Sequence, residues 1–167
     1  MRVLGIDPGF ATTGFAVIQR AQGRLASLAI GAIVTPGNLP PAARLSFLRA
    51  QLLQIIDEHS PDVMAIERLF FNSNVRTAMA VGQASGVALE ASASSGLEVH
   101  HYTPSEVKLS VVGVGNASKQ QVQTMVAALL RPEAGAPRPP DAADACAIGI
   151  CHINRSGLAK ALEAALR

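Results

Sequence analysis

The chain has 167 residues, of which 49% are apolar, and its 14 basic and 12 acidic side chains give a formal charge of +2. A chain of this length forms about one domain, with a core large enough to fold without disulfides or structural metals. The composition excludes a disordered protein, and no apolar run approaches the ~20 residues of a transmembrane helix. Because the first residues lack the pattern of a signal peptide, we expect a cytoplasmic protein whose two cysteines stay reduced.

The first half of the chain is predicted to form three strands, a helix and a fourth strand. Apolar runs over residues 3–7, 13–20 and 25–35 are separated by short turns, which is typical of an antiparallel meander. Residues 42–59 carry apolar side chains every three or four positions, which predicts an amphipathic helix. Since that helix connects two buried runs, we expect the strand over residues 62–67 to lie parallel to the first strand.

The second half is predicted to contain four helices and one more strand. A long alanine-rich helix covers about residues 75–95, and a strand covers residues 98–102. A short helix begins at Thr103-Pro104 and is broken by Gly113. Two further helices are expected, from Ser118 to about residue 130 and from Pro140 to about residue 154.

Together these elements predict an α/β protein with one mixed, five-stranded sheet and helices on both of its faces. The sheet would consist of a three-strand antiparallel meander and two parallel strands. We expect the domain to span residues 1–155 and residues 156–167 to form a short C-terminal tail or helix.

Two acids stand at the ends of apolar strands. Asp7 follows the first run and Glu67 ends the fourth, so parallel neighbouring strands would bring both to the same carboxyl edge of the sheet. An ionised group at the end of a buried strand is costly unless something compensates it. The alternative for either acid alone is a capping role or an ion pair with a nearby arginine such as Arg68.

Two more acids, Asp141 and Asp144, lie on one face in the first turn of the last predicted helix. Acids are common at helix N-termini because of the helix dipole, so this pair alone does not indicate function. The residues that follow are almost all apolar, however, which indicates that this helix packs on the sheet and carries both acids inward.

Four converging carboxylates would repel one another strongly unless cations lie between them. Mg²⁺ is a hard cation that prefers carboxylate oxygens and keeps several waters. Two such ions about 3.5–4 Å apart can promote phosphodiester hydrolysis. Their charge would also make a nearly neutral protein a plausible partner for a polyanion.

Four separated motifs carry a resemblance to a known family. In chain order they are Gly5-Ile-Asp-Pro-Gly9 with Gly14, Ala65-Ile-Glu67 with Phe70, Val107-Lys108 with Gly113 to Lys119, and Asp141-Ala-Ala-Asp144. This order and spacing resemble the RuvC family of Holliday junction resolvases over nearly the whole chain. The resemblance implies an RNase H-like fold, a homodimer, Mg²⁺- or Mn²⁺-dependent symmetric nicking of four-way DNA junctions that leaves 5′-phosphate ends, and the RuvA–RuvB branch-migration complex as a partner.

The same resemblance assigns roles residue by residue. The matches to the family's metal-binding tetrad, with two ions per subunit, are Asp7, Glu67, Asp141 and Asp144. Lys108 and Lys119 match basic residues near the scissile phosphate, where Lys108 would stabilise transition-state charge or position the phosphate. Phe70 matches an aromatic side chain that stacks on junction bases. Arg68 departs from the glutamine or glutamate common in the family, although it leaves the tetrad intact.

The residues themselves favour some of these roles and leave alternatives. Adjacent Phe70 and Phe71 in a polar loop are typical of base stacking, although one ring could pack inward. Arg76 is a candidate phosphate ligand or a solvated surface charge. Before the family is considered, Lys108 and Lys119 could also be scattered surface lysines.

The long helix carries a stripe of small residues, which permits close approach of another backbone. The stripe consists of Ala78, Gly82, Ser85 and Gly86. Tight packing on the protein's own sheet is one explanation. The resemblance implies the other, a twofold dimer contact that places two sites across one junction.

Two rival functions remain at this point. Gly-Ile-Asp-Pro-Gly also resembles the phosphate loop of actin-like ATPases, but 167 residues cannot supply the second domain that closes over a nucleotide. Residues 113–119 lack the spacing of a P-loop, so we expect no nucleotide. The other rival is a non-catalytic DNA-binding module, which would have no use for four converging acids.

Overall fold

The computed structural model describes residues 1–68, 75–130 and 139–166. Its elements, in chain order, are β1 (Arg2–Asp7), β2 (Thr12–Ala21), β3 (Arg24–Val34), α1 (Pro41–His59), β4 (Val63–Glu67), α2 (Val75–Ser94), β5 (Glu98–Tyr102), α3 (Pro104–Val112), α4 (Lys119–Leu130) and α5 (Pro140–Ala165). Among the described helices, none is both long and apolar enough to cross a membrane.

The five strands form one mixed sheet in the order β3-β2-β1-β4-β5. β1, β2 and β3 are antiparallel neighbours, whereas β4 lies parallel to β1 and β5 lies parallel to β4. This arrangement confirms the predicted meander with two parallel strands. The parallel pairing follows from the helical crossovers, because α1 connects β1–β3 to β4 and α2 connects β4 to β5.

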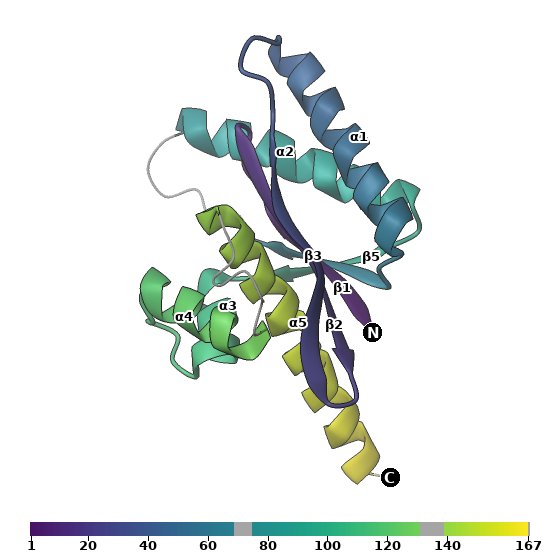
Figure 1. The fold of residues 1–167 in the computed structure, drawn as a ribbon, viewed down its shortest axis with the longest axis vertical. Coiled ribbons are helices and arrows are strands. Elements are labelled where there is room, and N and C mark those ends of the chain that lie inside the picture. Colours follow the sequence, from purple (N-terminus) through teal and green to yellow (C-terminus); the bar gives the residue numbers. More distant parts are fainter. Residues whose placement is uncertain (69–74, 131–138, 167) are drawn as a thin grey trace.

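Helices cover both faces of the sheet, as predicted (Figure 1). Alternation along β1 divides its side chains between two cores, with Val3 on one face and Leu4 and Ile6 on the other. The first core packs against α3, α4 and α5, and the second packs against α1 and α2. Both sides of β1 are therefore buried, which explains its nearly continuous apolar sequence.

Two glycines allow α5 to lie directly on the sheet. A Cβ atom built on Gly5 would overlap the carbonyl oxygen of Ala145 and lie 2.9 Å from the amide nitrogen of Gly149. A Cβ atom on Gly14 would overlap the carbonyl group of Asp141. Larger side chains at either glycine would therefore push α5, and the acids at its start, away from the strands.

The last helix is longer than predicted. It continues without a break from Pro140 to Ala165, and its end projects beyond the sheet (Figure 1). Arg20 of β2 supports it near the middle by donating a hydrogen bond to Asn154 at 2.7 Å. The alanine and leucine residues that follow have high helix propensity, so the helix continues past this contact.

Substituting Gly5→Ala should destabilise the protein by about 2 kcal/mol or more, because the added methyl group meets fixed backbone atoms. Chemical denaturation monitored by circular dichroism would measure this change. The control is Gly37→Ala, where the added Cβ meets no atom within 4 Å, and the change should stay within about 0.5 kcal/mol. Equal effects at the two positions would contradict the close approach of α5.

Candidate active site

The ends of two neighbouring parallel strands bring the first two acids together. Ile6 pairs with Ile66, so Asp7 and Glu67 are the next residues along β1 and β4. Both side chains are half-buried at the carboxyl edge of the sheet. Residues 3, 5 and 7 face α5, as do residues 63, 65 and 67, so strand alternation directs both acids to the same face.

The first turn of α5 adds two more acids to this edge. Asp141 and Asp144 are half-buried, whereas Ala142, Ala143 and the residues that follow Asp144 are buried against the sheet. Carboxylate oxygens of Asp7, Asp141 and Asp144 all lie within 4.8 Å of one another. The structure therefore brings Asp7 together with two acids that lie more than 130 residues later in the chain, and this convergence was predicted from the sequence.

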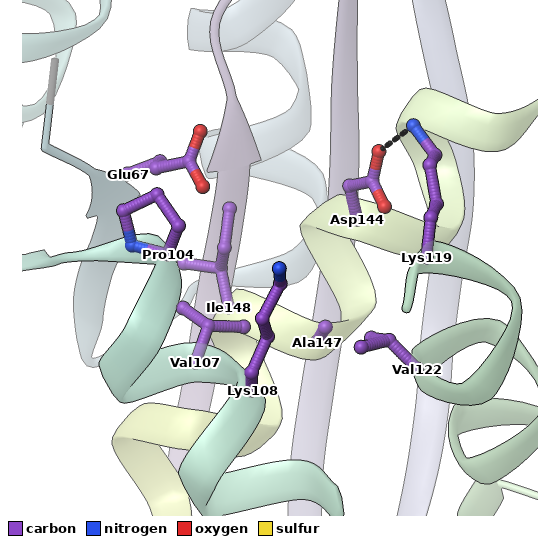
Figure 2. A pocket seen from close by; sticks show the side chains of 9 residues that line it. All are labelled: Glu67, Pro104, Val107, Lys108, Lys119, Val122, Asp144, Ala147 and Ile148. Carbon is purple, nitrogen blue, oxygen red and sulfur yellow. Dashed lines mark hydrogen bonds and ion pairs between the residues drawn. The ribbon is translucent and has the colours of Figure 1, made fainter. Parts of the chain in front are cut away.

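Glu67 lies beside this group rather than inside it. It lines a cavity of about 240 Å³ together with Asp144, Lys108 and Lys119. Figure 2 shows Glu67 and Asp144 on either side of the cavity, with Lys108 extending toward the space between them. The apolar floor consists of Val107, Val122, Ala147 and Ile148.

The acids interact strongly through their charges. Burial, followed by the nearby carboxylates of Glu67, Asp144 and Asp141, raises the pKa of Asp7 to about 7. Burial and then the charge of Asp144 also raise the pKa of Glu67. Each ionised acid disfavours ionisation of the next. Ionising all four acids at this edge therefore lowers the stability of the folded protein.

Lysine side chains supply part of the missing positive charge. Lys119, at the start of α4, donates a hydrogen bond to Asp144 at 2.5 Å. This hydrogen bond, opposed by partial burial and assisted by the charges of Asp144, Asp7 and Asp141, raises the pKa of Lys119. Lys108 of α3 forms no hydrogen bond or ion pair within the described part of the chain, so its ammonium group remains available.

The donor set fits a divalent metal ion. Among the described residues, every candidate ligand in the cluster is a carboxylate oxygen, the ligand that Mg²⁺ and Mn²⁺ prefer, and none is a histidine or cysteine. The cluster also lacks enough positive charge, since two lysines, of which only Lys119 is hydrogen-bonded to an acid, face four acids. Bound cations would remove the repulsion that raises the pKa of Asp7.

Three of the residues expected at the site have side chains outside the described part of the chain. Phe70 and Phe71 lie outside the described residues, and the same holds for the side chain of Arg76. Both phenylalanines nevertheless follow Glu67 closely in the chain. Their proposed contacts with DNA therefore remain predictions.

The small-residue stripe of α2 divides between the surface and the core. A Cβ atom on Gly82 or Gly86 would meet no atom within 4 Å, so both glycines face open space. Met79, one turn before Gly82, is 62% exposed on the same side of the helix. Ser85 is buried within the protomer at 7% exposure, so its small size also serves packing against the protein's own core.

One supporting feature was present in the sequence but not recognised there. Thr103 and Glu106 form a capping box that fixes the start of α3, with a hydrogen bond of 2.8 Å from the Thr103 amide to the Glu106 carboxylate. Arg155 of α5 lies 3.3 Å from the same carboxylate. The capping box and the ion pair together orient α3, which carries Lys108 into the cavity.

Known proteins are similar to this chain over almost its whole length. The family described as "Crossover junction endodeoxyribonuclease RuvC" matches residues 3–152. The crossover junction endodeoxyribonuclease RuvC of Pelotomaculum thermopropionicum is 48% identical over 153 residues, which cover 91% of this chain and 92% of that protein. The Thermus thermophilus RuvC structure is 31% identical with a TM-score of 0.86, covering 95% of this chain and 97% of that one. The T. thermophilus RuvC in complex with Holliday junction substrate is 32% identical with a TM-score of 0.89, covering 95% and 96%.

The raised pKa of Asp7 predicts a pH-dependent effect of Asp7→Asn on the metal-free protein. The pKa rises from 3.8 to about 7 on folding, so the unfolded chain releases this proton first and stability falls as pH rises through that range. Asp7→Asn removes this loss, so at pH 8 the variant should be more stable than the parent by about 1–3 kcal/mol. Near pH 4 the difference should largely disappear.

Urea denaturation at pH 4, 6 and 8 in the presence of a chelator would measure this effect. Added Mg²⁺ should then stabilise the parent more than the variant, because the parent keeps the full set of ligands. A variant that is less stable than the parent at pH 8, or a difference that does not depend on pH, would contradict the electrostatic account.

Proposed function

The chain belongs to the RuvC family of crossover junction endodeoxyribonucleases and has their RNase H-like fold, and from this premise we propose that it resolves four-way DNA junctions. It would hydrolyse one phosphodiester bond in each of two strands, symmetrically, and leave 5′-phosphate ends. The complex of the T. thermophilus relative with a Holliday junction substrate supports this choice of substrate. The reaction serves homologous recombination and DNA repair.

The observation that carries this proposal is the cluster of carboxylates at the end of β1. We propose that Asp7, Glu67, Asp141 and Asp144 hold two Mg²⁺ or Mn²⁺ ions per subunit. Such ions, when bound, lower the pKa of water and stabilise charge on the attacking and leaving oxygens of a phosphodiester. The residues contribute by holding their oxygens close together before the substrate arrives, at the cost of their mutual repulsion.

The two lysines of the cavity have different starting positions and different proposed roles. Lys119 forms an ion pair with Asp144. Once bound cations neutralise Asp144 instead, the Lys119 ammonium group would be able to bind a DNA phosphate. Lys108 already points into the cavity without a partner among the described residues, so it is suited to stabilise negative charge on the phosphate undergoing cleavage.

The residues that follow β4 are proposed to contact the junction itself. Phe70 would stack on bases near the crossover, a sequence-tolerant contact worth about 1–3 kcal/mol per base. Phe71 and Arg76 would add a second aromatic contact and a phosphate contact. Their closeness to Glu67 in the chain supports these roles, since Glu67 ends the strand that reaches the site.

A homodimer would place two such sites on one junction. We propose that the exposed side of α2, which carries Ala78, Gly82 and Gly86, forms the twofold contact. The 62% exposure of Met79 and the open space beside both glycines support this proposal. Two symmetric sites match a substrate that is itself nearly twofold symmetric.

The remaining assignments rest on the family. We propose that residues 1–155 form the nuclease domain and that the rest of α5 is a C-terminal extension of it. The relatives are bacterial, and we assign this chain to the cytoplasm, where the RuvA–RuvB branch-migration complex would deliver junctions to it. Neither a nucleotide nor a membrane is required for cleavage.

Cleavage of a synthetic four-way junction in Mg²⁺ without nucleotide tests the function. Asp7→Asn should lower the cleavage rate by about a thousandfold or more, because a metal ligand is lost, while junction affinity changes by less than about threefold. Asp57→Asn, which alters an exposed acid on α1, is the matched control and should cleave like the parent. Cleavage by Asp7→Asn at the parental rate would refute the metal role.

The dimer is tested by Gly82→Glu. Because the added side chain enters open space in the protomer, the variant should fold normally, yet it would place a charge in the proposed twofold contact. We expect monomers in sedimentation velocity at micromolar concentration and loss of coordinated nicking. Ala50→Glu, on the exposed side of α1, should remain dimeric. A monomeric parent protein would exclude the proposed contact.

A further inference from the structure

Most arginine side chains in the described part of the chain already have an acceptor within the protein. These pairs are Arg2 with the His59 carbonyl, Arg20 with Asn154, Arg44 with Thr35, Arg49 with Glu90, and Arg155 with Glu106. Two arginines with described side chains form no hydrogen bond or ion pair through the guanidinium: Arg24 and Arg68. A charged side chain without a partner in the protein is available for an external anion.

The two arginines lie at opposite ends of the sheet. Arg68 follows Glu67 directly, and its amide donates a 2.7 Å hydrogen bond to the Tyr102 carbonyl, which fixes its backbone at the carboxyl edge that carries the acids. Arg24 begins β3 at the hairpin with β2, and β2 runs from Thr12 near the acids to that far hairpin. Both side chains are exposed.

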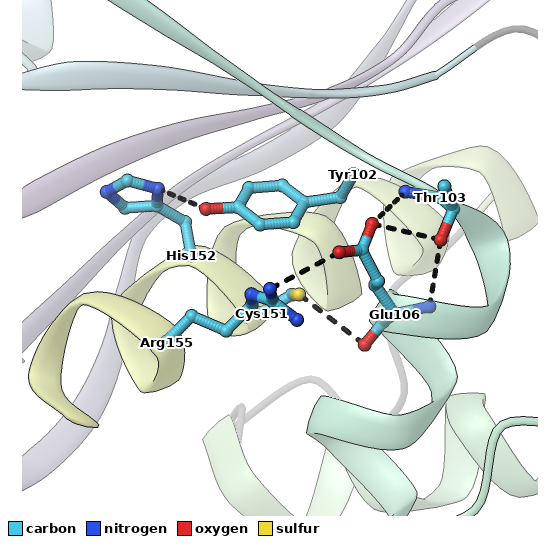
Figure 3. Close-up of polar contacts among 6 residues, drawn as sticks. All are labelled: Tyr102, Thr103, Glu106, Cys151, His152 and Arg155. Carbon is cyan, nitrogen blue, oxygen red and sulfur yellow. Dashed lines mark hydrogen bonds and ion pairs between the residues drawn. The ribbon is translucent and has the colours of Figure 1, made fainter. Parts of the chain in front are cut away.

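A nearby acid attracts Arg68 without binding it. The carboxylate of Glu106 accepts hydrogen bonds from the Thr103 amide and hydroxyl at 2.8 and 2.9 Å and lies 3.3 Å from Arg155 (Figure 3). These hydrogen bonds from Thr103, and after them the charges of Arg155 and Arg68, lower the pKa of Glu106. Glu106 therefore lies within electrostatic range of Arg68, while its oxygens are already occupied.

We propose that Arg68 binds a backbone phosphate adjacent to the one that is cleaved. The planar guanidinium offers paired N–H donors that match two phosphate oxygens, which a lysine cannot do. Arg68 follows Glu67 directly, and its exposed side chain begins at the edge of the sheet that carries the acids, so it would reach a phosphate next to the one held there. Lys108 and Lys119 line the cavity beside Glu67 (Figure 2), and Arg68 would add a third positive charge at the same edge of the sheet.

This role rests on the proposed junction cleavage but differs from catalysis. A phosphate contact made equally in the bound substrate and in the transition state strengthens binding and leaves the chemical step unchanged. It also carries no information about base sequence. Arg68 should therefore affect affinity and its dependence on salt, whereas the four acids affect the cleavage rate.

The test compares Arg68→Gln with Arg24→Gln in an Asp7→Asn background, which prevents cleavage during binding measurements. Affinity for a four-way junction is measured by fluorescence anisotropy over 50–200 mM salt. Arg68→Gln should weaken binding about fivefold at 100 mM salt and reduce the magnitude of the slope of log K against log salt by about 0.9. Arg24→Gln should change neither quantity, and Arg68→Lys should restore the slope but only part of the affinity.

A slope for Arg68→Gln equal to that of the background protein, or an equal loss for Arg24→Gln, would overturn the assignment. A second measurement separates this failure from failure of the proposed function. With the intact acid cluster and saturating enzyme, Arg68→Gln should cleave within about twofold of the parental rate. A parent that neither binds nor cleaves four-way junctions would refute the proposed function and the Arg68 assignment with it, whereas normal parental activity with an unchanged slope would refute Arg68 alone.

Discussion

Mutual repulsion among carboxylates at one edge of the sheet is the constraint on which this structure depends. Burial and three neighbouring acids raise the pKa of Asp7 to about 7. The fold therefore holds these carboxylates closer together than their mutual repulsion favours. The apolar contacts of α5 with the sheet, made possible by Gly5 and Gly14, stabilise the arrangement. Cations bound among these oxygens would restore the stability lost at this edge, which is why we propose that the fold prepares a site for such ions.

The two lysines beside the acids lie in different environments. Lys119 is engaged with Asp144, whereas Lys108 extends into the cavity from a helix that is anchored by the Thr103–Glu106 capping box. The packing of α3 on α5 therefore determines where the Lys108 ammonium group lies relative to the acids. The exposed Arg68 would add a phosphate contact that acts on affinity rather than on the chemical step.

Sequence reasoning predicted the sheet and the convergence of the acids because both follow from local patterns. Apolar runs ending in Asp7 and Glu67, with a helix between them, require parallel strands and a shared edge. The apolar sequence after Asp144 indicated that α5 faces the sheet. The ion pair of Lys119 with Asp144 could not be predicted, because it depends on how α4 packs after a turn. The direct contact between Gly14 and α5 depends on tertiary packing in the same way. The helix α5 also continues eleven residues past its predicted end at Asn154, because the residues that follow have high helix propensity.

The account is tested most directly by crystals soaked in Mn²⁺ and measured for anomalous scattering. It predicts two peaks about 3.5–4 Å apart among the carboxylates of Asp7, Glu67, Asp141 and Asp144 in the parent protein. The same soak of Asp7→Asn crystals should lose at least one of them. Parent crystals with no peak among these oxygens, or with manganese bound only elsewhere, would contradict the claim that the acids are gathered to hold cations.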